Sequence, residues 1–269
     1  MKKISLITVT YNAENTLKPT IDSVLSQSYK AIEHIIIDGA STDNTAALAK
    51  DYMERSLMAD NGHEVRLLIE PDNGIYDAMN KGLHLATGDY VCFLNAGDSL
   101  HNPDTIASLV KATGIDKHES ESKSGKGSVL PAVLYGNTDI VDGNGNFLSH
   151  RRLQPPEQLS WPSFKNGMLV CHQAFYARMD IAKETPYDLA YRYSADFDWC
   201  IRIMKKAEEQ GLPLANSHLV LANYLNEGAT TRHHKASLLE RYRIMRHYYG
   251  RLPTFGMHLW FILRAAIKH

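Results

Sequence analysis

The chain has 269 residues, of which 44% are hydrophobic and 22% charged, and its formal net charge is −1. Such a composition is ordinary for a globular protein long enough for one α/β domain with a C-terminal extension, and its core needs no disulfide staples. Cys92, Cys171 and Cys200 lack metal-ligand spacing and are expected to be free thiols in a reducing compartment. No run approaches about 18 apolar residues, and no signal peptide is recognisable. We therefore expect a cytoplasmic protein that could touch the inner face of the plasma membrane.

The first hundred residues alternate between strand-like and helix-like patterns. Apolar, β-branched runs predict strands, and apolar residues at helical spacing predict helices. Strands are expected at residues 4–10, 32–37, 65–70 and 89–94, and helices at 16–28, 44–55 and 75–86. This alternation with short loops predicts a mainly parallel sheet covered on both faces. Ligands of such sheets bind beyond the carboxyl ends of the strands, so we expect one site at that edge.

The second half of the chain has a less regular pattern. Residues 116–128 are polar and are expected to form a surface loop. Further elements are expected as strands at 133–138 and 147–150 around a turn at 142–145, an apolar stretch at 168–177, and an amphipathic helix at 196–209.

Two aspartates close apolar strands in this pattern. Asp38 follows the strand at 32–37, and Asp98 follows the strand at 89–94. A carboxylate buried at such a place needs a cation or hydrogen-bond donors as partners. Each could instead be a local cap, Asp38 of the following turn and Asp98 of a helix near Pro103. The pattern alone leaves both interpretations open.

Four ordered motifs resemble those of family 2 glycosyltransferases of the GT-A fold. They are Thr8–Asn12, Ile37–Asp43, Glu70–Gly82 and Thr87–Asp98, with weaker similarity at residues 171–173 and 194–199. The resemblance implies an α/β fold of the GT-A type, with a mainly parallel central sheet flanked by helices. It also implies a glycosyltransferase domain at 1–231, made of a nucleotide-sugar-binding half (1–110) and an acceptor half (130–231), and a basic, aromatic helical tail at 232–269.

The resemblance implies that residues of these motifs bind the donor, a nucleotide sugar. They are Thr10, Tyr11 and Asn12 beside the nucleoside, Asp38 as acceptor from the base, Asn73 and Gly74 where the backbone approaches the nucleotide, Asp77 and Lys81 near the ribose, sugar or phosphate, and Asn95 and Ala96. Gly74 suits a close approach because glycine has no Cβ. Asp77 and Lys81 are four residues apart on one helical face, so an exposed ion pair of little energetic value is the alternative.

Residues 95–98 stand where the family has its acidic metal motif, and they depart from it. Asn and Gly occupy positions where acidic residues are common, which leaves Asp98 as the one clear carboxylate ligand. Mg²⁺ or Mn²⁺ can be held by one or two protein groups together with diphosphate oxygens and water, and Asn95 could assist through its carbonyl oxygen. We therefore expect the cation to bind only weakly as long as the donor is not bound.

The second half is implied to carry the catalytic and acceptor residues. Asp196 falls on the family's catalytic-base aspartate, where a carboxylate can take the proton of the acceptor hydroxyl; a helix N-cap is the alternative. Asp198 points to another face of the helix and is expected to be structural or to face the acceptor. His172, Gln173 and His233 are placed on the acceptor or leaving-group side, with a structural role as the alternative for His172.

The tail combines aromatic residues with positive charge. From Arg232 to His269 it has eight Lys or Arg residues and one acid, Glu240. It could be a helix packed on the domain, or an interfacial helix on anionic lipid. Nucleic-acid binding is a third interpretation, to which the overall charge gives little support, so we expect no nucleic-acid partner.

The sequence therefore predicts an inverting glycosyltransferase of cell-surface polysaccharide biosynthesis. Its donor is expected to be a nucleotide sugar, of UDP type, and its acceptor a hydroxyl of a glycan or lipid-linked molecule. Inversion is implied by the resemblance. A catalytically inert, nucleotide-sugar-binding subunit of a polysaccharide-assembly complex is the alternative, supported by the reduced metal motif. A nucleotidyltransferase would need a Gly-rich, basic phosphate loop after the first strand, which residues 10–14 do not supply.

Overall fold

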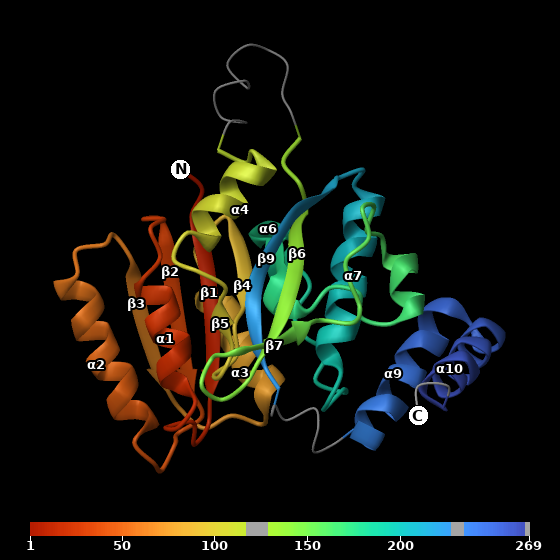
Figure 1. Cartoon of the computed structure of the whole chain (residues 1–269), viewed down its shortest axis with the longest axis horizontal. Coiled ribbons are helices and arrows are strands. Elements are labelled where there is room, and N and C mark those ends of the chain that lie inside the picture. Colours follow the sequence, from red (N-terminus) through yellow and green to blue (C-terminus); the bar gives the residue numbers. More distant parts are fainter. Residues whose placement is uncertain (117–128, 227–233, 267–269) are drawn as a thin grey trace.

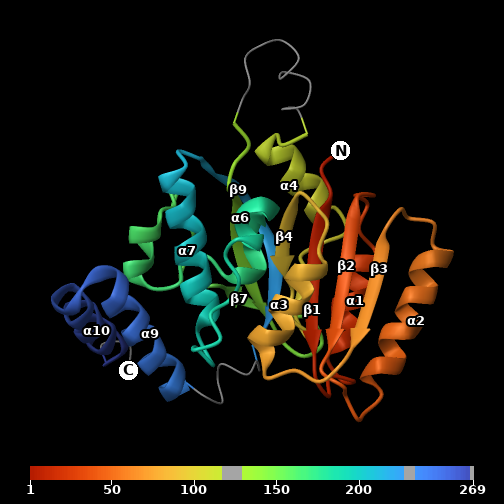
Figure 2. The ribbon, with the colours of Figure 1, turned by 180° about the vertical axis from the view of Figure 1, so that it is seen from behind.

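Helices cover both faces of a curved central sheet (Figures 1 and 2). The computed structural model describes residues 1–116, 129–226 and 234–266. Its nine-stranded sheet has the order β3-β2-β1-β4-β8-β6-β9-β5, and β7 pairs with β6. The strands are β1 (Ile4–Thr10), β2 (Ile32–Asp38), β3 (Glu64–Ile69), β4 (Tyr90–Phe93), β5 (Ser99–Leu100), β6 (Val133–Val141), β7 (Phe147–His150), β8 (Phe175–Arg178) and β9 (Leu214–Leu225).

The first four strands form the parallel half of the sheet. β1 pairs with β2 and β4, and β2 pairs with β3. Every residue of β1 and β2 is buried, because a parallel strand between two helical layers has no solvent face. Their nearly continuous apolar sequences follow from that burial. The carboxyl ends of β1, β2 and β3 meet at one edge, the lower edge in Figure 1.

The helices of this half are α1 (Leu17–Leu25), α2 (Thr45–Met58), α3 (Ile75–Leu85) and α4 (Thr105–Thr113). α3 packs on β1 and β2 on the face shown in Figure 2. Gly82 makes this packing close, since a Cβ there would lie 2.5 Å from Ile7 Cγ2. The strands and helices predicted for the first hundred residues are confirmed, with ends that differ by a few residues.

The second half of the sheet is mixed. β8 runs antiparallel to both β4 and β6, whereas β9 runs parallel to β6. The apolar stretch at 168–177 is not one element, because the 3-10 turn η3 (His172–Ala174) separates its first residues from β8. The remaining helices of this half are η2 (Trp161–Asn166), α6 (Met179–Lys183) and α7 (Ala195–Glu209). The predicted surface loop lies outside the described residues, except for Asp116.

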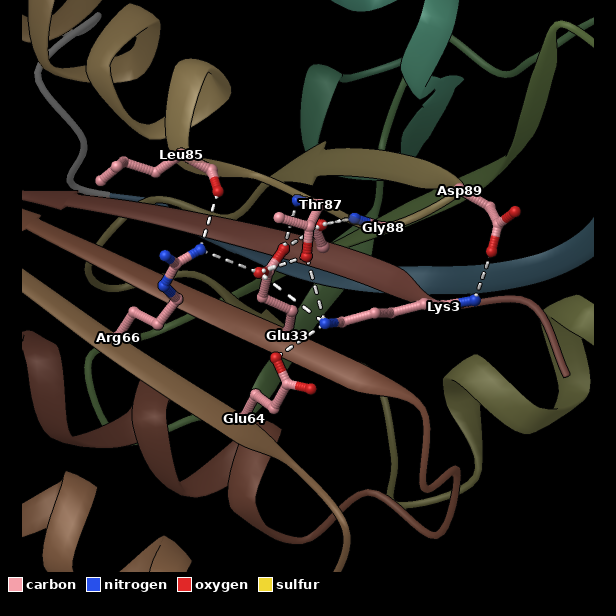
Figure 3. A network of polar contacts seen from close by, with 9 residues as sticks. Lys3, Glu33, Glu64, Arg66, Leu85, Thr87, Gly88 and Asp89 are labelled. Atoms are coloured by element: carbon pink, nitrogen blue, oxygen red, sulfur yellow. Dashed lines mark hydrogen bonds and ion pairs between the residues drawn. The ribbon is translucent and has the colours of Figure 1, made fainter.

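A buried acid joins the strands at the opposite, amino edge of the sheet (Figure 3). Glu33 is fully buried and accepts hydrogen bonds from Ser5 Oγ at 2.6 Å and from the backbone and hydroxyl of Thr87 at 2.8 Å each. Arg66 Nη1 lies 3.3 Å and Lys3 Nζ 3.9 Å from the same carboxylate. This network ties β1, β2, β3 and the loop before β4 together.

Two helices, α9 (His234–Tyr249) and α10 (Arg251–Ala266), follow the sheet and pack against each other and against η2. α9 buries Ile244 and Met245 in the main core. It is therefore a helix packed on the domain, in agreement with one interpretation of the tail. Within the described ranges, no helix combines the length and the apolar character needed to cross a membrane.

Candidate active site

Asp38 ends β2 and is fully buried at the carboxyl edge. Its Oδ1 accepts hydrogen bonds from the hydroxyls of Thr10 at 2.9 Å and Ser41 at 2.6 Å, and its Oδ2 accepts the backbone N–H of Ser41 at 2.9 Å. The carboxylate thus caps the turn after β2 and ties it to the end of β1.

The loop after β1 carries Tyr11 and Asn12. Asn12 has a left-handed backbone with φ 49°, which Asn tolerates better than most residues. Its side-chain oxygen accepts the backbone N–H of Thr42 at 2.9 Å, and its own N–H donates to Ser41 Oγ at 2.9 Å. Asn12 therefore fixes the loop, while Tyr11 is 66% exposed and leaves its ring available to a planar ligand.

Gly39 lets the loop between β3 and α3 approach the end of β2. A Cβ at Gly39 would collide with the carboxylate of Asp72 and would lie 3.4 Å from the ring of Tyr11. Asp72 accepts the backbone N–H of Gly74 at 2.8 Å, and Gly74 has φ 120°, which favours glycine. The loops after β1, β2 and β3 therefore meet beside Asp38.

Asp77 and Lys81 of α3 have different main partners. Asp77 Oδ2 accepts the backbone N–H of Asn73 at 2.9 Å and closes the turn before the helix. Lys81 Nζ lies 2.9 Å from Glu70 Oε1 and donates to the carbonyl of Pro71 at 2.7 Å, but its distance to Asp77 is 3.9 Å. The structure thus places both residues around the end of β3, with only a long contact between them.

Asp196 reaches the carboxyl edge from the first turn of α7. Its Oδ1 accepts a hydrogen bond from the hydroxyl of Tyr76 at 3.2 Å, and its Oδ2 lies 3.2 Å from His172 Nδ1. The other ring nitrogen of His172, Nε2, lies 3.1 Å from Asn95 Nδ2. The chain Asn95–His172–Asp196–Tyr76 therefore joins residues from both halves of the sequence.

The partners of Asp196 determine its protonation. Burial raises the pKa of Asp196, but the hydrogen bond from His172, the electrostatic attraction of His172 and that of Arg241 together outweigh burial and hold the pKa below its usual value. Asp196 is thus ionised at neutral pH, and its side chain keeps 14% exposure toward solvent.

Asp98, which follows β4 in the sequence, is buried and only 4% exposed. Gln173 Nε2 donates to its Oδ2 at 2.6 Å, and the backbone N–H of Leu225 donates to its Oδ1 at 3.0 Å. Burial raises the pKa of Asp98 to about 6, although both hydrogen bonds act in the opposite direction. Asp98 therefore links the end of β4 to η3 and β9. It does not cap the helix near Pro103, because α4 begins after Asp104.

A divalent cation fits this edge only in the company of a diphosphate. Among the described residues, no group of three or more His, Cys, Asp or Glu side chains could hold a metal ion. One candidate ligand is Asp98, although both of its carboxylate oxygens accept hydrogen bonds from the protein. The other is Asn95 Oδ1, a buried oxygen that has no hydrogen-bond partner among the described residues. Most ligands of a cation here would have to come from the donor and water.

Two predicted residues have other surroundings. Asp198 is buried against α9, where its Oδ1 accepts the hydroxyl of Tyr248 at 2.8 Å and its Oδ2 accepts Arg202 Nε at 2.6 Å. Both contacts fit the structural interpretation of this residue. Ala96 is partly buried against the apolar cluster between α1 and α2. His233 lies outside the described residues.

Sequence reasoning missed Tyr76 and Asp72 as residues of this edge. Tyr76 is 8% exposed, and its ring stacks on Tyr187 with 5.3 Å between centroids. Both missed residues stand inside the motif at 70–82, so the motif itself was the available signal. Helical spacing drew attention to Asp77 and Lys81, but only the packing of α3 against the second half shows that Tyr76 meets Asp196.

A cavity of about 760 Å³ lies at the opposite, amino edge. Its lining residues are Glu33, Met53, Glu54, Ser56, Leu57, His63, Glu64, Val65, Arg66 and Thr87. None of the predicted site residues is among them, and Glu33 already has its partners within the protein. The candidate active site is therefore the carboxyl edge around Asp38 and Asp196.

Comparison with known proteins identifies the family. Residues 5–120 match the profile of glycosyl transferase family 2. The chain is also 35% identical over 223 residues to the PGL/p-HBAD biosynthesis glycosyltransferase of Mycobacterium tuberculosis, a match that covers 82% of this chain and 75% of the relative. The chain belongs to glycosyl transferase family 2. The amylovoran biosynthesis glycosyltransferase AmsB of Erwinia amylovora is 31% identical to this glycosyltransferase over 230 residues, or 82% of this chain and 71% of AmsB.

Solved structures show the same fold and confirm the predicted GT-A class. S. aureus TarS 1–349 in complex with UDP-GlcNAc has a TM-score of 0.66 at 18% identity; the match covers 91% of this chain and 64% of that one. This glycosyltransferase thus spans less than two thirds of the TarS chain. The mannosyltransferase PcManGT from Pyrobaculum calidifontis, in complex with GDP-Man and Mn²⁺, has a TM-score of 0.56 at 15% identity, with 98% and 75% covered.

Proposed function

We propose that this glycosyltransferase moves a sugar from a UDP-sugar to a hydroxyl of a glycan or lipid-linked acceptor, with inversion, in cell-surface polysaccharide biosynthesis. The observation that carries the proposal is the meeting of residues from both halves of the chain at Asp196, where Tyr76 and His172 contact the carboxylate and Asn95 contacts His172. The names of the relatives in amylovoran and PGL/p-HBAD biosynthesis support the class of pathway, and the UDP-GlcNAc complex of TarS supports the class of donor.

Asp196 is the proposed general base. The acceptor oxygen forms its bond to the anomeric carbon on the face opposite the diphosphate, and the bond from that carbon to the diphosphate oxygen breaks. The hydroxyl proton passes to the Asp196 carboxylate, and the nucleoside diphosphate leaves with the electron pair. His172 and Tyr76 each hold one carboxylate oxygen, so a free lone pair keeps its direction toward the acceptor. A single displacement of this kind inverts the anomeric configuration.

Asn95 is part of this arrangement. Its Nδ2 lies 3.1 Å from His172 Nε2, and His172 Nδ1 lies 3.2 Å from Asp196 Oδ2. We therefore propose that Asn95 acts through His172 and helps to hold the ring against the base.

The donor is proposed to lie across the loops after β1, β2 and β3. The exposed ring of Tyr11 offers a stacking surface to the nucleobase, and Asp38 holds together the end of β1 and the turn after β2 that would lie beside it. We propose that Mg²⁺ or Mn²⁺ accompanies the diphosphate, with Asp98 and Asn95 Oδ1 as the protein groups that would hold it. When bound, the cation would stabilise the charge of the leaving group.

A screen of nucleotide sugars tests this proposal. UDP-, GDP- and dTDP-sugars are added with and without Mn²⁺, and the unfolding temperature and the release of nucleoside diphosphate are measured. A UDP-sugar at about 100 times its Kd should stabilise the fold by about 2.7 kcal/mol and should release UDP when an acceptor is present. Binding without release, with every acceptor tried, would favour the inert subunit, the candidate that the reduced metal motif supports. No stabilisation by any nucleotide sugar would refute both.

α10 leaves an apolar face in solvent. Leu252 is 85%, Phe255 62%, Leu259 48% and Leu263 49% exposed, and their spacing places them on one side of the helix. Arg243, Arg246 and Arg251 are exposed on α9 and α10. Apolar residues beside positive charge are typical of helices that lie on anionic membranes. We propose that α10 contacts the cytoplasmic face of an anionic membrane, where a lipid-linked acceptor would be found.

Vesicle sedimentation tests this contact. Vesicles with about one third phosphatidylglycerol should bind the protein, and pure phosphatidylcholine vesicles should bind it at least ~10-fold less, since each Lys or Arg near an anionic surface contributes about 1 kcal/mol. The double substitution Leu252→Glu/Phe255→Glu should abolish binding. Leu57→Glu, at a residue of α2 that is 84% exposed, is the matched control and should change nothing. Equal binding to both vesicle types would contradict the proposal.

A further inference from the structure

The one acid of the basic tail holds the backbone that leads into α7. Glu240 lies on α9, and its Oε1 accepts the backbone N–H of Arg192 at 2.9 Å. Its Oε2 accepts the backbone N–H of Tyr193 at 2.7 Å and of Ser194 at 3.0 Å. Three consecutive N–H groups thus converge on one carboxylate, separated from them by more than 40 residues of sequence.

The three residues are the last ones before the helix that carries Asp196. Ser194 is the N-cap of α7, and its carbonyl accepts the N–H of Phe197 at 3.1 Å in the first turn. Its hydroxyl lies 2.9 Å from the hydroxyl of Ser237, also on α9, and both serines are buried. A negative charge at a helix N-terminus also interacts favourably with the helix dipole. α9 therefore fixes the N-cap of α7, which lies two residues before Asp196.

α9 also contacts the residues on the far side of Asp196. The guanidinium of Arg241 lies over the ring of Phe197, with Cζ 5.9 Å from the centroid. Two turns further on, Tyr248 donates to Asp198. α9 thus contacts residues 194, 197 and 198, which lie on both sides of Asp196 in the sequence. The carboxylate of Asp196 itself contacts His172 and Tyr76.

We propose that Glu240 is a positioning residue for the transfer reaction, and that α9 is by this means part of the active site. The proposal rests on the role of Asp196 as the base. Loss of the Glu240 carboxylate would leave three N–H groups without their acceptor, and the start of α7 would relax. A displacement of about 1 Å at a catalytic group can cost ~10²-fold in rate. Among the described residues, the hydrogen bonds of Glu240 go to residues 192–194 and not to the loops after β1, β2 and β3, so donor binding should not change.

The test compares three substitutions at a temperature where each variant is folded by circular dichroism. Glu240→Ala should lower kcat at least ~10-fold, with the donor KM within about twofold of the wild type. Glu240→Gln should lose less, because its carbonyl oxygen can still accept from Tyr193 and Ser194. Glu184→Gln is the matched control: Glu184 pairs with Lys206 near the other end of α7, at 2.9 Å, and its loss should leave kcat unchanged.

A double-mutant cycle separates positioning from mere stability. In the Asp196→Asn background, Glu240→Ala should change the residual turnover by less than about twofold, because a residue that acts through the base has nothing left to position. An equal loss in both backgrounds, or a normal kcat in Glu240→Ala, would overturn the proposal. If Asp196→Asn itself retained full turnover, the assignment of the base would fail instead, which is a different result.

Discussion

The Asp196→Asn variant should bind the donor as the wild type does and transfer its sugar at least ~10²-fold more slowly, the lower range for a lost general base. The amide has nearly the shape of the carboxylate, but it has one acceptor oxygen where Asp196 serves both His172 and Tyr76, and it cannot take a proton at neutral pH. Single-turnover transfer and donor titration by calorimetry measure the two effects separately.

The control for this variant is Asp51→Asn. Asp51 is exposed on α2 and pairs with Arg55, one turn along the same helix, at 2.9 Å. Both its turnover and its donor affinity should equal those of the wild type, since exposed pairs contribute little. A normal transfer rate in Asp196→Asn would exclude this residue as the base, whatever the affinity shows.

Replacing Glu33 with Ala should destabilise the fold by about 3–5 kcal/mol, the cost of removing one partner from a buried charge network. The substitution would leave the hydroxyl of Ser5, both donors of Thr87 and the guanidinium of Arg66 without their common acceptor (Figure 3). Urea unfolding at neutral pH should show the midpoint move to lower urea. At a urea concentration where this variant is folded, its transfer rate should equal that of the wild type, because Glu33 lies at the amino edge of the sheet, opposite the candidate active site.

Glu64→Ala is the comparison for Glu33. Glu64 also pairs with Lys3, at 2.7 Å, but its side chain is 62% exposed, so its loss should cost less than about 1 kcal/mol. Similar losses in the two variants would show that burial of Glu33 does not decide the stability of this edge.

The parallel half of the fold was predictable because its pattern is local. The sequences of β1 and β2 are apolar runs, each followed by a turn and by a helix with periodically spaced apolar residues. Short crossover connections between parallel strands permit few other arrangements. In the second half, the strands at 133–138 and 147–150 and the helix at 196–209 were also predicted. The pairing of β8, β6 and β9 was not, because these strands pair across long sequence separations that no local pattern encodes. The apolar stretch at 168–177 shows the difficulty: periodicity does not reveal that His172 begins a turn before β8.

The candidate site residues were found where a motif carried them. Asp38, Asp98 and Asp196 were all found from motifs at strand ends or at the start of a helix. What those motifs could not give was the partner of each carboxylate. Tyr76 and Asp196 are 120 residues apart, and the contact of Glu240 with residues 192–194 depends on how α9 packs. The burial of Asp98 by Gln173 likewise appears only in three dimensions.

The most direct test of the central claim is a crystal structure of the Asp196→Asn variant with the UDP-sugar that the screen selects. We expect the nucleobase against Tyr11 and Asp38, the diphosphate beside residues 95–98, and the anomeric carbon facing residue 196. A donor bound instead in the cavity beside Glu33, or one that leaves Asp38 and residue 196 on separate surfaces, would contradict the account.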